Sequence, residues 1–375
     1  MRVGLDGYPL CEPLTGVGHY TFELACALAL GHPADEFELI APFDFHSSVV
    51  AQLELNPIQN LSLVSLRLKS ARGRWWSFHL PRYLKRSRLD LFHGTNYELP
   101  LWNSRCTVLT VHDLSSLRYP ELHRRQLARR MRLRLPLACK VARSIITPTE
   151  AVKDELCAHL RLKPSKVTAI HEAPRAAFHP APPEECLRVR ERLGIEEEFL
   201  LFVGTLEPRK NLVTLLKAYA HIVRETPWRP QLVIAGGEGW LMDETFSMLR
   251  EEAIAERLRF SGYLDDDGLR ALYSSCRAFI YPSLYEGFGL PPLEAMACGA
   301  PVIAGRIDAL QETIAGTALL VPAFDVPALA AAILDLLTNQ SRRDELRTAG
   351  LARAATFSWT KAAELTRAVY ETALQ

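Results

Sequence analysis

Short apolar runs rich in β-branched residues alternate with longer helix-forming stretches along nearly the whole of this 375-residue chain. This alternation is typical of parallel sheets whose strands are joined by crossover helices, and it predicts an α/β fold with two series of strands. The first series is Arg2–Leu5, Phe37–Ala41, Leu61–Leu66, Leu89–Phe92, Cys106–Val111, Ser144–Thr147 and Val167–Ile170. The second is Phe199–Val203, Gln231–Ala235, Leu258–Ser261, Ala278–Tyr281, Pro301–Ala304 and Ala318–Val321.

A proline-rich segment, residues 174–183, separates the two series. Because proline ends regular structure, we predict an interdomain linker there, with the boundary near residue 182. A chain of this length also exceeds what one hydrophobic core usually serves. We therefore expect α/β domains at 1–182 and 183–356, followed by a Ser/Thr-capped helix at 357–375 that packs away from the second core.

Composition indicates a folded protein of the reducing cytoplasm. The chain is 48% hydrophobic and 23% charged, and its eight cysteines include no C-x-x-C pair. It begins with a strand pattern rather than a secretory signal. Its richest apolar stretch, residues 318–337, is interrupted by Pro322, Asp325 and Pro327, so we expect no membrane-spanning helix.

Charge is distributed unevenly between the two halves. Residues 1–180 carry 24 Lys and Arg against 16 Asp and Glu, whereas the rest carries 20 against 27. This asymmetry predicts that the first half meets an anionic partner, either membrane headgroups or a phosphorylated acceptor. We identify no nucleic-acid recognition motif, so nucleic acid is not a predicted partner. The membrane interpretation rests on two stretches in which cations lie close together, the first interleaved with Trp75, Trp76, Phe78 and Tyr83. Their cations are Arg67, Lys69, Arg72, Arg74, Arg82, Lys85, Arg86 and Arg88, then Arg124, Arg125, Arg129, Arg130, Arg132 and Arg134.

Two segments have the features of phosphate sites. Gly16, Val17 and Gly18 precede or open a predicted helix, whose N–H groups and dipole favour an anion, although a simple turn has the same pattern. Thr21 stands where a dinucleotide fingerprint needs its third glycine, which disfavours a nicotinamide dehydrogenase. In the second half, Gly204 and Thr205 end a strand shortly before two adjacent cations, Arg209 and Lys210, which suit a diphosphate but also a solvated helix cap.

The most informative segment is residues 281–304. A strand leads into a loop that contains Glu286, a helix is predicted to start near Leu290, and Glu294 is the fifth residue of that helix. Two carboxylates so placed can face a bound polyol, while the N–H groups of residues 288–290 face a phosphate. In so apolar a stretch the alternative is buried core, but buried glutamates require polar partners.

The two glutamates at this spacing, with the Glu207–Asn211 segment before them, resemble the retaining family 4 glycosyltransferases of the GT-B fold. The similarity extends over nearly the whole chain and includes Gly16 to Gly18, Val111 to Asp113 and the Ser358–Trp359 helix start. It implies two Rossmann-like parallel-sheet domains with an interdomain cleft for a nucleotide-sugar donor. It also implies that the last helix crosses back onto the N-terminal domain.

The resemblance further implies roles for individual residues. Catalytic roles fall to His112, beside the transferred sugar, to Glu286, on the hydroxyls of that sugar, and to Arg209 and Lys210, on the diphosphate. Glu294 would hold the ribose. The remaining donor-binding residues would be Gly16, Val17, Gly18, Gly204, Thr205, Gly287, Phe288, Gly289 and Leu290. Many relatives have Gly-Arg where this chain has Gly204-Thr205, which leaves open which cation dominates at the diphosphate.

Other polar groups have structural interpretations beside functional ones. The strand-end pair of His112 and Asp113 is also typical of a structural turn, and His93 is equally open. Asp265–Asp267 resembles a metal-binding acidic cluster, but we predict a helix N-cap there. We expect no metal and no other cofactor, because fixed cations and backbone donors can stabilise the departing diphosphate.

Bacterial mannosyltransferases of surface polysaccharide synthesis have especially similar motifs, so GDP-mannose is the predicted donor and a glycan or lipid-linked glycan the predicted acceptor. The predicted location is cytoplasmic, peripheral on the inner face of the plasma membrane. Alternatives are a transferase for another UDP- or GDP-sugar, a nucleotide-sugar epimerase of similar two-domain shape, or a catalytically silent GT-B glycan-binding protein.

Overall fold

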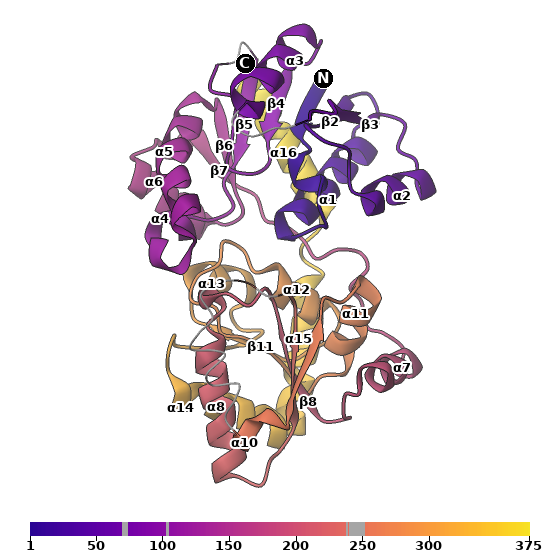
Figure 1. Ribbon diagram of the computed structural model, residues 1–375, viewed down its shortest axis with the longest axis vertical. Helices are drawn as coiled ribbons and strands as arrows, with labels where there is room; N and C mark the ends of the chain where they lie inside the picture. The colour runs from indigo at the N-terminus through magenta and orange to yellow at the C-terminus, as the bar shows by residue number, and fades with distance from the viewer. Residues whose placement is uncertain (70–73, 103–104, 238, 240–251) are drawn as a thin grey trace. The chain divides into compact units, whose positions relative to one another are not determined.

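The computed structural model describes residues 1–69, 74–102, 105–237, 239 and 252–375. These residues form two compact units, each built on one parallel sheet (Figure 1). The first unit comprises Met1–Arg118, Arg125–Glu172 and Ser358–Gln375. The second comprises Tyr119–Arg124 and Ala173–Phe357.

The described part of the first unit has a seven-stranded sheet of order β3-β2-β1-β4-β5-β6-β7. Its strands are β1 (Arg2–Asp6), β2 (Glu36–Ala41), β3 (Leu61–Ser65), β4 (Leu91–Gly94), β5 (Cys106–Thr110), β6 (Ser144–Thr147) and β7 (Val167–Ala169). Its helices are α1 (Gly16–Gly31), α2 (Ser47–Leu55), α3 (Leu80–Arg86), α4 (Ser115–Arg118), α5 (Arg125–Val141), α6 (Glu150–Leu160) and α16 (Trp359–Leu374).

The described part of the second unit has a six-stranded sheet of order β10-β9-β8-β11-β12-β13. Its strands are β8 (Phe199–Val203), β9 (Gln231–Ala235), β10 (Leu258–Gly262), β11 (Ala278–Tyr281), β12 (Val302–Gly305) and β13 (Leu319–Val321). Its helices are α7 (Pro183–Leu193), α8 (Leu212–Glu225), α10 (Glu252–Ala255), α11 (Asp266–Ser275), α12 (Leu290–Ala297), α13 (Asp308–Ile314), α14 (Val326–Thr338) and α15 (Gln340–Ala354).

The central strands of each sheet, such as β8 and β11, are buried on both faces, which explains why they are continuous apolar runs. In β8, Phe199 and Leu201 belong to one hydrophobic cluster with α7, α11 and α12, whereas Leu200 and Phe202 belong to another with α8 and α14. Successive side chains of a strand point to opposite faces, so the strand supplies both clusters. The predicted α/β fold with two Rossmann-like sheets is confirmed.

The strand order reverses direction between β1 and β4 in the first sheet and between β8 and β11 in the second. In open α/β sheets, ligands bind beyond the carboxyl ends of the strands at such switch points. The loops that follow β8 and β11 are those that carry Arg209, Lys210 and Glu286. The fold therefore brings together, in the second unit, segments that are some seventy residues apart in the sequence.

The C-terminal helix α16 belongs to the first unit, where it lies against α1 (Figure 1). Its N-cap is Ser358, whose Oγ accepts a hydrogen bond from the Lys361 N–H at 3.2 Å. Val369 and Tyr370 contribute to the same hydrophobic cluster as Leu24 of α1. None of the described helices is both long enough and apolar enough to cross a membrane.

The division between the units does not lie where the prolines suggested. It falls between Glu172 and Ala173, ahead of the predicted boundary near residue 182. The physical reason is that the proline-rich segment packs on the second unit: Phe178 is buried in its core, and Arg175 pairs with Glu294. The prolines interrupt helix and strand in this segment, but the segment is packed against the second unit and is not an exposed linker.

The predicted aromatic and basic surface around residues 67–88 is also corrected. Trp75 and Trp76 start a π-helical turn, Trp75–His79, and are only 1% and 7% exposed, because both side chains pack in a core under α3. Tyr83 is half-buried, and its hydroxyl donates to Glu38 Oε2 at 2.6 Å. Of the predicted aromatics, only Phe78 is an exposed side chain. Arg72 lies outside the described residues.

Candidate functional site

A compact charged cluster occupies the switch point of the second sheet. Glu286, in the loop after β11, accepts hydrogen bonds from Lys210 Nζ at 2.7 Å and from Arg209 Nη1 at 2.8 Å. The hydroxyl of Tyr281, the last residue of β11, donates to Glu286 Oε1 at 2.9 Å. Arg209 Nη2 also donates to Glu207 Oε1 at 2.6 Å. The predicted catalytic residues Glu286, Arg209 and Lys210 therefore lie in direct contact.

The cluster is buried, and its electrostatics follow from that. Burial alone raises the pKa of the Glu286 carboxyl, but the charges of Arg209 and Lys210 outweigh this effect and lower its pKa to about 2. Burial and the neighbouring Arg209 lower the pKa of Lys210 below 10.5, although Glu286 opposes them. Glu286 is therefore a carboxylate at neutral pH, which can only accept hydrogen bonds.

Backbone contacts fix the two loops that carry this cluster. The Leu284 N–H donates to the Arg209 carbonyl at 2.8 Å, and Asn211 Nδ2 donates to the Pro282 carbonyl at 3.1 Å. Gly204 lies against the Lys210 side chain, while Thr205 is exposed. Gly236, at φ +138°, has no room for a side chain, because a Cβ atom would come within 2.1 Å of the Gly204 carbonyl oxygen.

The glycine loop before α12 is shaped by packing as well as by its N–H groups. Gly289 has φ +98°, and a Cβ atom there would meet Leu310 at 2.3 Å, so only glycine fits. Helix α12 starts at Leu290 as predicted, but Pro291 and Pro292 carry no N–H. The amide donors predicted to face a phosphate, those of residues 288–290, all precede these prolines, and their contact with a phosphate stays a prediction. Phe288 is buried, and Gly287 is also in this loop.

Glu294 is the fifth residue of α12 and is only 7% exposed. Its Oε1 accepts a hydrogen bond from Arg175 Nε at 3.0 Å. Arg175 Nη1 in turn donates to both carboxylate oxygens of Asp266, at 2.7 and 2.8 Å. The structure thus places Glu294 on the predicted helix beside an arginine that the sequence analysis had assigned to a linker. Its contact with a ribose stays a prediction.

In the first unit, helix α1 opens at Gly16, as predicted, and Thr15 is its N-cap residue. Gly16 is exposed, and nothing lies within 4 Å of the position a Cβ atom would take, so a ligand has room beside it. Val17 follows in the same turn. Gly18 is different: it is buried, and a Cβ atom would come within 3.1 Å of Leu14 and of the Pro9 carbonyl. Packing within the first unit explains Gly18 without a donor contact.

His112 follows β5 and is held through both ring nitrogens inside the first unit. Nε2 lies 2.7 Å from the Thr95 carbonyl oxygen, which can only accept, so Nε2 carries a proton. Nδ1 lies 3.3 Å from Glu172 Oε1. The rings of Tyr20 and Tyr97 pack edge-on against the imidazole, with centroids at 4.7 and 5.6 Å. The proposed contact between His112 and the transferred sugar stays a prediction.

His93 is part of a buried hydrogen-bonded chain. Its Nδ1 lies 2.7 Å from the Tyr370 hydroxyl of α16, and its Nε2 lies 2.8 Å from Thr110 Oγ1. Thr110 is also 2.9 Å from the Tyr20 hydroxyl. Burial and the nearby His112 lower the pKa of His93 to about 3, so its ring is neutral. These contacts give His93 a structural role that ties α16 to the first sheet.

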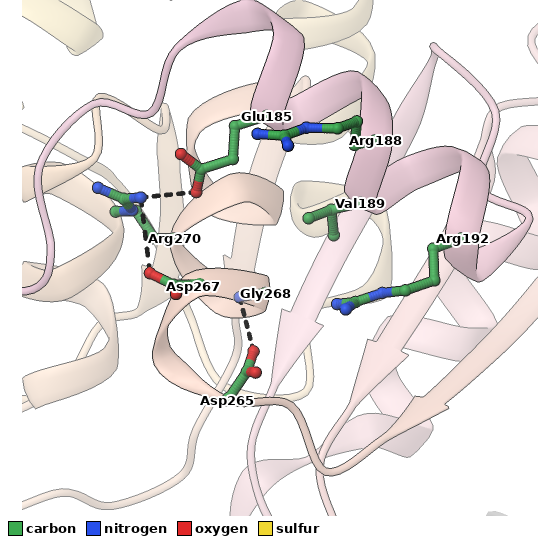
Figure 2. A pocket seen from close by; sticks show the side chains of 8 residues that line it. All are labelled: Glu185, Arg188, Val189, Arg192, Asp265, Asp267, Gly268 and Arg270. Atoms are coloured by element: carbon green, nitrogen blue, oxygen red, sulfur yellow. Dashed lines mark hydrogen bonds and ion pairs between the residues drawn. The ribbon is translucent and has the colours of Figure 1, made fainter.

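The acidic segment Asp265–Asp267 caps a helix, as predicted. Asp265 Oδ1 accepts the Gly268 N–H at 2.9 Å at the start of α11, and Asp267 pairs with Arg270 (Figure 2). Arg270 also pairs with Glu185 of α7 at 2.6 Å. These residues line a surface pocket between α7 and α11, drawn in Figure 2, together with Arg188 and Arg192.

Comparison with known proteins identifies the family. Residues 14–173 match the family model described as Glycosyltransferase Family 4, and residues 187–353 match the one described as Glycosyl transferases group 1. The O-antigen chain mannosyltransferase B of Escherichia coli is 32% identical to this chain over 377 residues, which covers 96% of each protein. This chain belongs to the family 4 glycosyltransferases.

Other relatives and solved structures agree with this assignment. The O-antigen chain mannosyltransferase RfbU of Salmonella typhimurium is 24% identical to this glycosyltransferase, over 86% of this chain and 88% of that protein. The crystal structure of Anabaena HepE in complex with UDP and glucose has a TM-score of 0.75 at 18% identity, covering 99% of both chains. WaaG, a glycosyltransferase involved in lipopolysaccharide biosynthesis, has a TM-score of 0.72 at 16% identity, covering 98% of both chains. These likenesses show the GT-B fold.

Sequence reasoning missed three residues whose side chains hydrogen-bond to the side chains of Glu286, His112 and Glu294. Tyr281 was read only as the end of a strand, and Glu172 and Arg175 fall at or beside the proline-rich segment. The usable signal was the presence of two charged residues among small and apolar ones in that segment. A charge in such surroundings requires a partner, as Glu286 and Glu294 do.

Proposed function

We propose that this glycosyltransferase moves mannose from GDP-mannose to a glycan or lipid-linked glycan acceptor, with retention of configuration at the anomeric carbon. The observation that carries the proposal is the buried contact of Glu286 with Arg209 and Lys210 at a switch point of the sheet. The relatives named O-antigen mannosyltransferases support the choice of sugar. A different UDP- or GDP-sugar donor, or a catalytically silent glycan-binding protein, is the alternative.

The proposed reaction breaks the bond between the anomeric carbon and the diphosphate oxygen and forms one to an acceptor hydroxyl oxygen. Negative charge accumulates on the departing diphosphate, and Arg209 and Lys210 stabilise it there. Glu286, held as a carboxylate, accepts hydrogen bonds from the hydroxyls of the transferred sugar. Attack occurs on the face that the diphosphate leaves, and a diphosphate oxygen takes the proton of the acceptor. GDP and an α-mannoside are the products.

The donor is tested by thermal denaturation with GDP, GDP-mannose and a panel of UDP-sugars. We expect GDP and GDP-mannose to raise the Tm, because a ligand at a hundred times its Kd stabilises the folded state by about 2.7 kcal/mol. Proton NMR of the product of transfer then reports the anomeric configuration. Stabilisation by a UDP-sugar, with none by GDP or GDP-mannose, would refute the donor, and an inverted product would refute retention.

We also propose that transfer needs no metal ion. Arg209 and Lys210 supply fixed positive charge at the diphosphate. Transfer rates are expected to be the same with excess EDTA as without it, and unchanged by added Mg²⁺ or Mn²⁺. Loss of transfer in EDTA, restored by either cation, would overturn this proposal.

A membrane surface is the proposed anionic partner of the first unit, with the protein peripheral on the cytoplasmic leaflet. One face of α5 carries exposed leucines, Leu133 and Leu137, beside the exposed cations Arg129, Arg132 and Lys140. The charges of Arg130 and Arg134 are partly neutralised, since both side chains form ion pairs with Glu98. A cation near an anionic leaflet adds about 1 kcal/mol, and leucines add apolar contact.

Sedimentation with vesicles tests the membrane proposal. Binding to phosphatidylglycerol vesicles at low salt is expected, with little binding to phosphatidylcholine vesicles. A variant with Arg129→Glu and Arg132→Glu should bind the anionic vesicles more weakly. A variant with Arg188→Glu and Arg192→Glu, an exposed pair on α7 of the second unit, makes the same change in net charge and serves as the matched control. Equal sedimentation of both variants and the wild-type protein, or no binding at all, would contradict the proposal.

A further inference from the structure

Arg175 is a buried cation in the segment that enters the second unit, and it is held on three sides. Its Nη1 donates to both oxygens of Asp266 at 2.7 and 2.8 Å, and its Nε donates to Glu294 Oε1 at 3.0 Å. Its guanidinium carbon lies 4.6 Å from the centroid of the Phe178 ring. The side chain is only 9% exposed. These contacts with one aromatic ring and two carboxylates hold the plane of the Arg175 guanidinium in a single orientation.

That orientation determines where the Glu294 carboxylate points. A glutamate has three side-chain torsions, so a carboxylate on α12 without a fixed partner would sample several directions. A hydrogen bond from a rigid, anchored guanidinium selects among them, which lysine cannot do, because an ammonium is a point donor on a flexible stem. Asp266 and Phe178 hold Arg175, and Arg175 holds Glu294.

We propose that Arg175 is a positioning residue of the donor site, which presents the Glu294 carboxylate to the ribose hydroxyls of the nucleotide. The inference rests on the proposed function, because it takes Glu294 as the ribose ligand. Its basis in the structure is the contact of Arg175 Nε with Glu294 Oε1, a contact that the anchoring by Asp266 makes rigid. Binding groups held in advance in the productive geometry lose less entropy when the ligand arrives.

A neighbouring arginine provides the matched control. Arg270 of α11 is also largely buried, at 14% side-chain exposure, and also donates to a carboxylate, Glu185, at 2.6 Å. Figure 2 shows Arg270 with its partners Glu185 and Asp267. If Arg175 served stability alone, Arg175→Gln and Arg270→Gln would have the same kind of effect.

The experiment measures ribose selectivity by calorimetry. GDP and 2′,3′-dideoxy-GDP are titrated into the wild-type protein and each variant, or the two uridine analogues if the wild-type protein binds UDP instead. We expect the wild-type protein to bind the ribonucleotide about tenfold more tightly, the worth of a charge-assisted hydrogen bond. Arg175→Gln and Arg175→Lys should bind the ribonucleotide about tenfold more weakly while the dideoxynucleotide binds as before. Arg270→Gln should keep the wild-type selectivity.

A further variant guards against a failure to fold. Asp266 is 42% exposed, so Asp266→Asn removes one anchor of Arg175 without burying an unpaired cation elsewhere. It should lower the ribose selectivity in the same direction by a smaller factor. Glu294→Gln sets the limit, at which selectivity is lost.

The outcomes separate the two proposals. If Arg175→Lys and Asp266→Asn keep the wild-type ribose selectivity, the positioning role is wrong and the proposed function stands. If the wild-type protein binds nucleoside diphosphates without selecting the ribose, the positioning role is likewise overturned. If it binds neither GDP nor UDP, the proposed function fails and the positioning role fails with it.

Discussion

Glu286→Gln is expected to lower kcat by about two to three orders of magnitude, as loss of one transition-state electrostatic contact typically does, while nucleoside diphosphate still binds. The reason is the placement of the carboxylate. Glu286 follows β11 and is held ionised by Arg209 and Lys210, so it offers full negative charge to the hydroxyls of a sugar whose ring is becoming positive. Contacts that strengthen as the bond breaks are lost from kcat rather than from binding.

Two further variants make this result specific. Glu294→Gln should raise the donor KM with a smaller change in kcat, because a ribose ligand acts in the ground state and the transition state alike. Glu207→Gln removes the other carboxylate of Arg209 and so controls for loss of a buried ion-pair partner, which can cost about 3 to 5 kcal/mol of stability. Its kcat should fall less than that of Glu286→Gln.

Steady-state kinetics and calorimetry with the free nucleotide measure these differences, and thermal denaturation reports the stability of each variant. Full activity in Glu286→Gln would show that this carboxylate does not contact the reacting sugar. Equal loss of nucleotide affinity in Glu286→Gln and Glu294→Gln would show that the two roles have been assigned wrongly.

The parallel sheets could be predicted from the sequence because a strand that is buried on both faces is a continuous run of apolar residues. The runs at Phe199–Val203 and Ala278–Tyr281 have the bounds in the structure that their apolar residues indicate. The helix starts at Ser358 and Asp265 were also local, since each cap accepts a hydrogen bond from the N–H three residues on. Such features need no knowledge of distant residues.

Features that depend on distant partners could not be read in the same way. The Pro174–Pro183 segment has the composition of a linker, but Arg175 pairs with Glu294 and Phe178 enters the core of the second unit. Trp75 and Trp76 lie among cations in the sequence, and nothing local reveals that both rings pack under α3. In both cases we inferred that a segment is exposed to solvent from its amino-acid composition alone, and the structure shows buried side chains there.

The candidate site could be predicted in part: its residues could be named from the sequence, but their contacts with one another could not. The spacing of glycines and glutamates around Glu286 identified the loop after β11 as part of the site. The adjacent cations Arg209 and Lys210 identified the loop after β8. Their direct contact follows from the strand order, which makes β8 and β11 neighbours and which the sequence does not state. Tyr281, which also contacts Glu286, has no signature in the sequence, because a tyrosine at the end of a buried strand is ordinary core.

Lys210→Met should lower kcat by about two to three orders of magnitude, comparable with the loss of Glu286, because it removes a fixed positive charge from the departing diphosphate. Methionine has nearly the length of the lysine stem, so the packing against Gly204 and the Tyr281 ring is largely kept. Lys210→Arg is the charge-conserving control. We expect only partial recovery, since a guanidinium cannot occupy the place of an ammonium that touches both Tyr281 and Glu286.

The pH dependence of kcat gives this prediction a second measurement. Burial and Arg209 lower the pKa of Lys210, and the charged form is the one that stabilises the diphosphate, so activity should fall with rising pH at a point below 10.5. In that window the unfolded chain holds more protons at this lysine than the folded protein does, so its contribution to stability increases as pH rises. Loss of activity there is therefore not caused by unfolding at Lys210. Thermal denaturation over the same range checks this, and a Lys210→Met variant that keeps the alkaline fall in its residual kcat would assign that fall to another group.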